Sequence, residues 1–125
     1  MEDRLREVIA GRSERMVERV VALSEINSHT ANKPGGDRVG ELLAAWFAEL
    51  GLSSRRVASE RYADHWVLST AAAEASSAGV IGLVGHHDTV FPLGPLARRP
   101  FTVADGVVRG PGVFDMKAGI VQAIH

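Results

Sequence analysis

Residues 80–90 (VIGLVGHHDTV) decide the fold class, because an apolar run ends directly on a group of polar residues. Residues 80–84 are continuously apolar, which is typical of a strand covered on both faces in the middle of an α/β sheet. In sheets of that kind, ligands bind just outside the carboxyl ends of the strands. We therefore expect a central strand at 80–84 and a functional site at the residues that follow it.

Two amphipathic helices are predicted before this stretch. Apolar residues recur at helical spacing over residues 5–26, where Gly11 can interrupt the helix. A second helix is expected to begin at Asp37 as its N-cap and to be closed by Gly51. The intervening residues 27–36 (NSHTANKPGG) are rich in Asn, Ser, Gly and Pro, and are predicted to form a loop.

Strands and a final helix account for the rest of the chain. Strands are predicted at 52–58 and 65–70, followed by a surface connection at 71–78. Asp105-Gly106 is a strong turn signal, so the short apolar segments on either side of it, 101–103 and 107–109, are predicted to form a hairpin. The last helix is expected to start at Asp115. Helices that alternate with strands predict an α/β domain with a layered helix–sheet–helix architecture.

Composition excludes several classes of protein. The chain has 125 residues and no Cys, with 14 Lys+Arg against 15 Asp+Glu and a formal net charge of −1. The lack of Cys excludes a disulfide scaffold and a thiolate metal site, and the balanced charge argues against a nucleic-acid partner. No apolar run is long enough for a membrane span, and the N-terminus has no signal-peptide pattern. We therefore expect a cytoplasmic protein with no membrane partner.

His86 and Asp88 can act together on one metal ion. In an extended segment, residues i and i+2 face the same way, so both side chains can point into one cleft. A neutral imidazole is a good Zn²⁺ ligand, and a carboxylate that accepts its other ring N–H fixes the orientation of the ring. The alternative is an ordinary surface turn, and the His-x-Asp pattern alone does not separate the two.

A second motif, 110–117 (GPGVFDMK), lies at the start of the last predicted helix. Asp115 can cap that helix, or its carboxylate can bridge two cations, since the glycines let backbone pack closely against a metal site. Lys117 can pair with Asp88 or Asp115, or it can be a solvated or structural charge.

Together these motifs resemble the two N-terminal signatures of a metallohydrolase family. They are 85–90 (GHHDTV) and 110–120 (GPGVFDMKAGI), in that order and separated by the predicted hairpin. The family comprises dizinc exopeptidases and deacylases: glutamate carboxypeptidase of the G type, acetylornithine deacetylase, succinyl-diaminopimelate desuccinylase and aminoacylase. The loop at 32–35 and the helix start at 37–39 are similar to the carboxypeptidase G branch, and the resemblance runs along nearly the whole chain.

The resemblance implies a role for three residues. His86 matches the family's metal-binding histidine, Asp88 matches the catalytic aspartate that orients this histidine, and Asp115 matches the aspartate that bridges both metal ions. The implied cofactor is a pair of Zn²⁺ ions, with Co²⁺ or Mn²⁺ as alternatives. The peptide bond after the bridging aspartate is often cis in this family, so the resemblance implies a cis bond between Asp115 and Met116.

The resemblance also implies a fold and an activity. Residues 1–125 resemble the N-terminal part of a zinc-exopeptidase-like catalytic domain, truncated after the second metal motif. Family members add a smaller domain that often dimerises, so a homodimer is implied for the full-length form. The implied reaction is hydrolysis of an amide bond next to a free carboxylate, in a C-terminal peptide bond or an N-acyl amino acid. The family's general base lies in a Glu-Glu pair that has no match in this sequence, so we expect these residues alone to be inactive.

Two other functions stay open. The chain can be a non-catalytic α/β segment or binding module with a vestigial metal site. A nucleotide-binding α/β protein is disfavoured, because no Gly-x-Gly-x-x-Gly pattern opens a helix after a strand and no Walker lysine pattern is present. The presence of His86, Asp88 and Asp115 favours the hydrolase.

Overall fold

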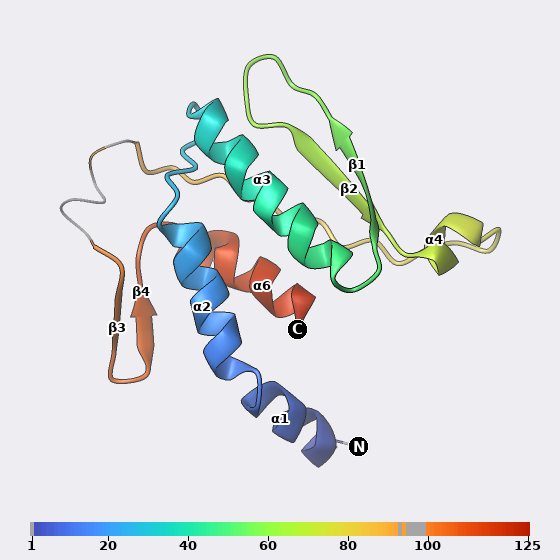
Figure 1. Ribbon diagram of the computed structural model, residues 1–125, viewed down its shortest axis with the longest axis horizontal. Coiled ribbons are helices and arrows are strands. Elements are labelled where there is room, and N and C mark those ends of the chain that lie inside the picture. Colours follow the sequence, from blue (N-terminus) through green and yellow to red (C-terminus); the bar gives the residue numbers. More distant parts are fainter. Residues whose placement is uncertain (1, 93, 95–99) are drawn as a thin grey trace.

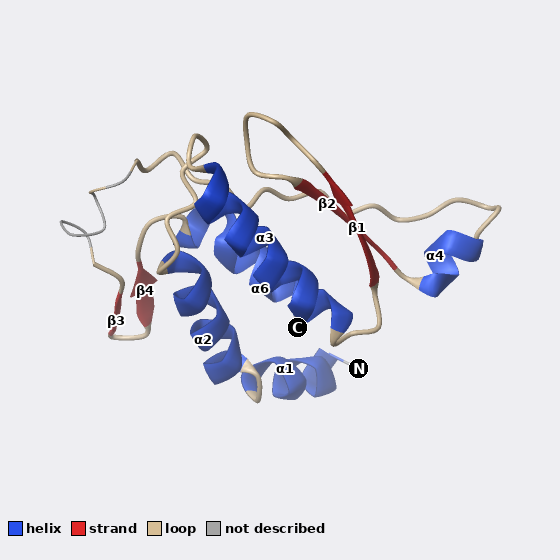
Figure 2. Cartoon of the chain, turned by 45° about the horizontal axis from the view of Figure 1, so that its top comes forward, coloured by secondary structure: helices blue, strands red, loops and turns tan. Residues whose placement is uncertain are grey.

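Three helices lie side by side and carry the core. In the computed structural model, which describes residues 2–92, 94 and 100–125, these helices are α2 (Ser13–Ser24), α3 (Lys33–Ala48) and α6 (Ala118–Ile124) (Figures 1 and 2). Each contributes apolar side chains to one buried cluster: Val20 and Leu23, Val39 and Leu43, and Val121 and Ile124. The predicted amphipathic faces therefore pack against one another.

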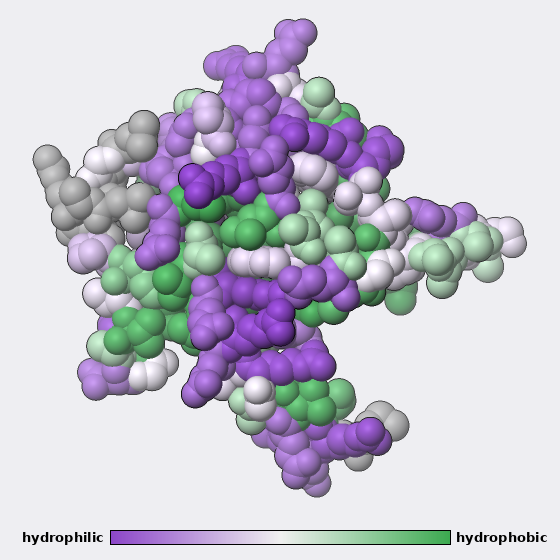
Figure 3. Space-filling model, viewed as in Figure 1, coloured by the Kyte–Doolittle hydropathy of each residue, from purple (hydrophilic) through white to green (hydrophobic). Residues whose placement is uncertain are grey.

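A short helix, α1 (Glu2–Ala10), precedes this core. It ends at Ala10, and a turn at Gly11 and Arg12 separates it from α2, so the predicted interruption of the first helical segment is confirmed. None of its residues is buried, and Leu5 and Ile9 are more than half exposed. Figure 3 shows hydrophobic atoms at the surface of this helix. Among the described residues, no helix is both long enough and apolar enough to cross a membrane.

The helix α3 begins earlier than the sequence predicts. Asn32 is its N-cap, with a side chain that accepts a backbone N–H of the first turn, and Pro34 lies in that turn, where its fixed φ suits a helix. The prediction of Asp37 as the N-cap is therefore wrong, and the predicted loop is shorter. Gly51 has a φ of 79° just beyond the helix, as expected for a glycine that closes it.

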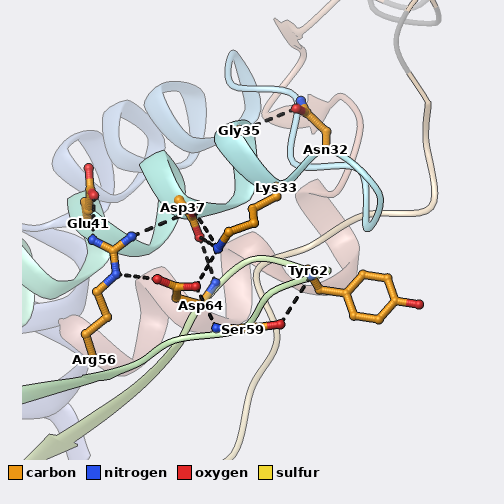
Figure 4. A network of polar contacts seen from close by, with 9 residues as sticks. All are labelled: Asn32, Lys33, Gly35, Asp37, Glu41, Arg56, Ser59, Tyr62 and Asp64. Carbon is orange, nitrogen blue, oxygen red and sulfur yellow. Dashed lines mark hydrogen bonds and ion pairs between the residues drawn. The ribbon is translucent and has the colours of Figure 1, made fainter.

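A network of charges joins the first turns of α3 to the loop before β2 (Figure 4). The carboxylate of Asp64, whose side chain is 8% exposed, accepts hydrogen bonds from Lys33 Nζ at 2.5 Å and Arg56 Nε at 2.6 Å. The backbone N–H of Asp64 donates to Asp37 Oδ1 at 2.7 Å. The bonds from Lys33, the Ser59 backbone and Arg56 hold the pKa of Asp64 well below its ordinary value of 3.8.

The strands form two separate antiparallel hairpins. In one, β1 (Ser53–Val57) pairs with β2 (His65–Ser69), and in the other β3 (Thr102–Ala104) pairs with β4 (Val107–Arg109). β1, β2 and β4 lie within predicted segments, and β3 is shifted by one residue from the predicted 101–103. The turn residues Asp105 and Gly106 have φ values of 53° and 71°, as a two-residue hairpin turn requires. The predicted hairpin is confirmed.

The predicted surface connection after β2 contains a short helix, α4 (Ala71–Ala75). Alanine has the highest helix propensity, and the Thr70 hydroxyl caps the helix by accepting the N–H of Ala73 at 3.1 Å. The segment is not buried and projects to one side in Figure 1.

Residues 80–84 are extended but unpaired, so the prediction of a covered central strand is wrong. Both sheets of the described chain have two strands, and neither includes this segment. The side chains of Ile81 and Val84 are 96% and 97% exposed. An apolar run predicts burial, but it does not specify which strands provide the cover. The described elements therefore form a small mixed α/β arrangement, and they do not form a parallel sheet between two layers of helices.

We expect this exposed apolar run to drive self-association, because an extended segment with free backbone groups is a template for strand pairing. Replacing Ile81 and Val84 together with lysine is expected to raise the monomer fraction in size-exclusion chromatography with light scattering. The matched control is the double lysine variant of Val103 and Val107, which are exposed on the β3–β4 hairpin. Wild-type protein that is already monodisperse under the same conditions would contradict this prediction.

Candidate metal site

The three predicted site residues are joined through the ring of His86. Nδ1 of His86 lies 3.1 Å from Asp88 Oδ1, and Nε2 of the same ring lies 2.9 Å from Asp115 Oδ1. Each ring nitrogen therefore faces a carboxylate, one from its own motif and one from the second motif. The structure brings together residues that are 29 positions apart in the chain.

His86 and Asp88 share one side of the chain because the segment is extended. His87, between them, lies on the opposite side, and a Cβ added at Gly40 of α3 would lie 3.5 Å from its Nε2. Burial against α3 lowers the pKa of His87 below its ordinary value of 6.5. The alternation of side chains predicted for residues 86–88 is thus confirmed, and His87 faces α3 rather than Asp115.

Asp115 lies in η1 (Val113–Lys117), a wide helical turn that is kinked at Asp115 and Met116, whose φ values are −126° and −133°. The peptide bond between these two residues is cis, as the resemblance implied. Asp115 does not cap a helix, because neither η1 nor α6 has a side-chain cap. The capping alternative is therefore wrong. The backbone N–H of His86 donates to Met116 Sδ at 3.4 Å and joins the two motifs directly.

The loop that follows residue 84 is held by hydrogen bonds to residues 28–30, which lie far away in the sequence. The N–H of Thr89 donates to the Ser28 carbonyl at 2.9 Å, and the N–H of Thr30 donates to the Thr89 carbonyl at 3.0 Å. The Ser28 hydroxyl donates to the His87 carbonyl at 2.8 Å. These bonds form a short parallel bridge that fixes the backbone on which His86 and Asp88 stand.

Thr30 is a site residue that the sequence analysis missed. Its hydroxyl donates to Asp88 Oδ2 at 2.5 Å, across 58 positions of the chain. Burial alone would raise the pKa of Asp88, but the hydrogen bonds from Thr30 and His86 outweigh it and leave this pKa below 3.8. For His86, burial alone would lower the pKa, but the hydrogen bonds to Asp115 and Asp88 outweigh burial and raise this pKa above 6.5. No local sequence signal marks Thr30, which lies in a polar loop.

Lys117, in the second motif, is buried and connects the site to the end of α2. Its side chain is 1% exposed, and its Nζ donates to the Leu23 carbonyl at 2.7 Å and to the Ile26 carbonyl at 3.2 Å, at the end of α2. Burial lowers its pKa to about 8. Of the alternatives predicted for Lys117, the structural charge is confirmed, and its bonds go to carbonyls rather than to Asp88 or Asp115.

The site opens on a cavity of about 310 Å³. Gly112 at its wall has a φ of 75°, and a Cβ there would lie 2.5 Å from Thr89 Cγ2. Only glycine allows this loop to approach the bridge so closely. The cavity walls include both motifs and two aromatic side chains: His86, Asp88, Thr89, Phe91, Phe114 and Asp115.

The donor set at this cavity suits a zinc ion. Imidazole nitrogen and carboxylate oxygen are both ordinary Zn²⁺ ligands, and His86 and Asp115 present one of each, with side chains 48% and 77% exposed. Asp88 is on the other edge of the ring, where an orienting carboxylate belongs. In the described part of the chain, no group of three or more His, Cys, Asp or Glu side chains is arranged to hold one ion. Two atoms of the described residues, His86 Nε2 and Asp115 Oδ1, are therefore of a type and in a position to bind a metal ion together.

No family model matches the chain, and no curated protein matches it.

Proposed function

We propose that the chain belongs to a metal-dependent hydrolase that cleaves an amide bond next to a free carboxylate, in a C-terminal peptide bond or an N-acyl amino acid. The observation that supports this best is the 2.9 Å approach of His86 Nε2 and Asp115 Oδ1 at one cavity, with Asp88 on Nδ1. The resemblance of residues 85–90 and 110–120 to the dizinc metallohydrolase family leads us to propose a zinc-exopeptidase-like catalytic domain. We also propose a pair of Zn²⁺ ions as the cofactor, with Co²⁺ or Mn²⁺ as alternatives.

Each residue has a defined task in this proposal. Asp88 would accept the Nδ1–H of His86, so that Nε2, which faces Asp115 Oδ1 at 2.9 Å, would be available to an ion bound between them. Asp115 provides a carboxylate whose two oxygens can serve two cations. When bound, the metal ions polarise the scissile carbonyl and lower the pKa of water. The general base implied by the resemblance has no match in the sequence, so turnover by these 125 residues alone is not expected.

Metal binding tests the proposal without requiring activity. We expect the chain to bind Zn²⁺ weakly in isothermal titration calorimetry, because two ligand atoms do not complete a tetrahedral set. His86→Ala and Asp115→Asn are each expected to weaken binding by more than the roughly 10–100-fold that loss of an orienting partner costs. Matched controls are His65→Ala on β2 and Asp3→Asn on α1, which are both exposed.

The outcomes separate the functions that the sequence left open. Binding that is lost in the two site variants and kept in the two controls supports the hydrolase. Binding that survives both His86→Ala and Asp115→Asn would contradict the site assignment. A chain that binds no Zn²⁺, Co²⁺ or Mn²⁺ would instead favour a module with a vestigial site.

A further inference from the structure

We propose that Thr30 is a positioning residue of this site, because its hydroxyl holds the Asp88 carboxylate in the orientation that in turn sets the His86 ring. The inference rests on the proposed function. The four residues form one continuous chain of hydrogen bonds. Thr30 Oγ1 donates to Asp88 Oδ2 at 2.5 Å, Asp88 Oδ1 lies 3.1 Å from His86 Nδ1, and His86 Nε2 lies 2.9 Å from Asp115 Oδ1.

Backbone hydrogen bonds hold Thr30 in place independently of its hydroxyl. The bridge to Thr89 holds the backbone on both sides, through the Thr30 N–H to the Thr89 carbonyl at 3.0 Å and the Thr89 N–H to the Ser28 carbonyl at 2.9 Å. A β-branched side chain on a fixed backbone has few χ1 rotamers. Its hydroxyl carries one proton, and the other nearby acceptor, the Thr89 carbonyl, is farther away at 3.3 Å. The proton therefore goes to Asp88.

This contact matters because a carboxylate on its own turns easily. The terminal torsion of aspartate is broad, so one bond to His86 does not determine where the two oxygens point. With Oδ2 held by Thr30, Oδ1 stays opposite Nδ1 of the ring. Asp115 Oδ1, 2.9 Å from Nε2, competes for the ring proton, so a firmly held Asp88 carboxylate shifts the balance toward the Nδ1–H tautomer, in which Nε2 is free to bind a metal ion.

Two substitutions at Thr30 separate the hydroxyl from the shape of the side chain. Thr30→Val keeps the branched shape and both backbone bonds but has no hydroxyl, whereas Thr30→Ser keeps the hydroxyl. We expect Thr30→Val to weaken Zn²⁺ binding in calorimetry by about 10-fold or more, as for other partners of metal ligands. Thr30→Ser is expected to restore most of the affinity. The matched control is Thr102→Val, at an exposed threonine on β3.

A second measurement on the metal-free protein is independent of the proposed function. The ¹⁵N chemical shifts of the His86 ring, taken at a pH where the ring is neutral, are expected to show a smaller share of the Nδ1–H tautomer in Thr30→Val than in wild type and Thr30→Ser, because the unheld Asp88 carboxylate then competes less well with Asp115. If wild type binds no metal, the proposed function fails while this spectrum still tests Thr30. The inference is overturned if Thr30→Val leaves the tautomer unchanged. It is equally overturned if Thr30→Val and Thr30→Ser lower affinity and thermal stability in parallel, since Thr30 would then only join two loops.

Discussion

Replacing Lys117 with alanine is expected to lower the free energy of unfolding by about 2–5 kcal/mol, the range for truncating a large buried side chain. The side chain is 1% exposed, and its Nζ reaches the Leu23 and Ile26 carbonyls. Truncation leaves a cavity beside Gly112 and removes the partner of two carbonyls, which adds about 1–3 kcal/mol for each that stays buried. Relief from burying an ammonium group offsets part of this loss. Urea denaturation followed by circular dichroism measures the difference.

Lys117→Met serves as the companion variant because it keeps the length of the buried chain. It is expected to lose less stability than Lys117→Ala, and the difference reports the packing contribution. Arg109→Ala, at an exposed cation on β4, is the control for loss of charge alone. An unfolding free energy for Lys117→Ala that is within about 1 kcal/mol of wild type, an effect typical of many point substitutions, would contradict the structural role.

Replacing Asp64 with asparagine is expected to lower the melting temperature by about 5 °C, because it removes the charge from a covered carboxylate that accepts hydrogen bonds from Lys33, Arg56 and the Ser59 backbone. Asparagine keeps the shape but not the charge, so that Lys33 pairs only with Asp37, and Arg56 pairs only with Glu41 and, at 3.8 Å, with Asp37. The exposed Asp3→Asn substitution is the control. A shift no larger than that of the control would show that the network contributes little.

The stability contributed by Asp64 is also expected to depend on pH. Its pKa is lower in the folded protein than its ordinary value of 3.8, mainly because of the hydrogen bond from Lys33. The contribution is therefore complete above that value and is lost as the pH falls through the folded pKa. The gap in melting temperature between wild type and Asp64→Asn should be widest near neutral pH and should begin to narrow below about pH 5. A gap in melting temperature that stays constant or widens on acidification would contradict a lowered pKa for Asp64 in the folded protein.

Features that depend on neighbouring residues could be predicted from the sequence. The Asp105-Gly106 turn requires positive φ at both residues, which the local sequence supplies, so the hairpin followed directly. The alternation of His86, His87 and Asp88 is a property of any extended segment, and the structure retains it. Asp115 was matched through its motif, and its carboxylate lies against His86.

Features that depend on distant partners could not be predicted in this way. Residues 80–84 have the composition of a buried strand, but burial requires pairing strands that the pattern does not identify. Asn32 and Asp37 are both good N-cap residues, and the choice between them depends on Asp64, which draws Asp37 into a tertiary contact. Thr30 and Lys117 acquire their roles from contacts 58 and 94 positions away.

The bridge between the Ser28–Thr30 loop and Thr89, together with the bond from Lys117 to Leu23, has a consequence for how the protein folds. Closing loops of this length costs entropy that is recovered only when distant elements have packed. We therefore expect the geometry around His86 to form late in folding, after α3 and the two hairpins have formed locally. A metal ion that binds only the native state stabilises that state by mass action. Zinc would then slow amide exchange in the helical core around Leu23 as well as in the loops that it touches.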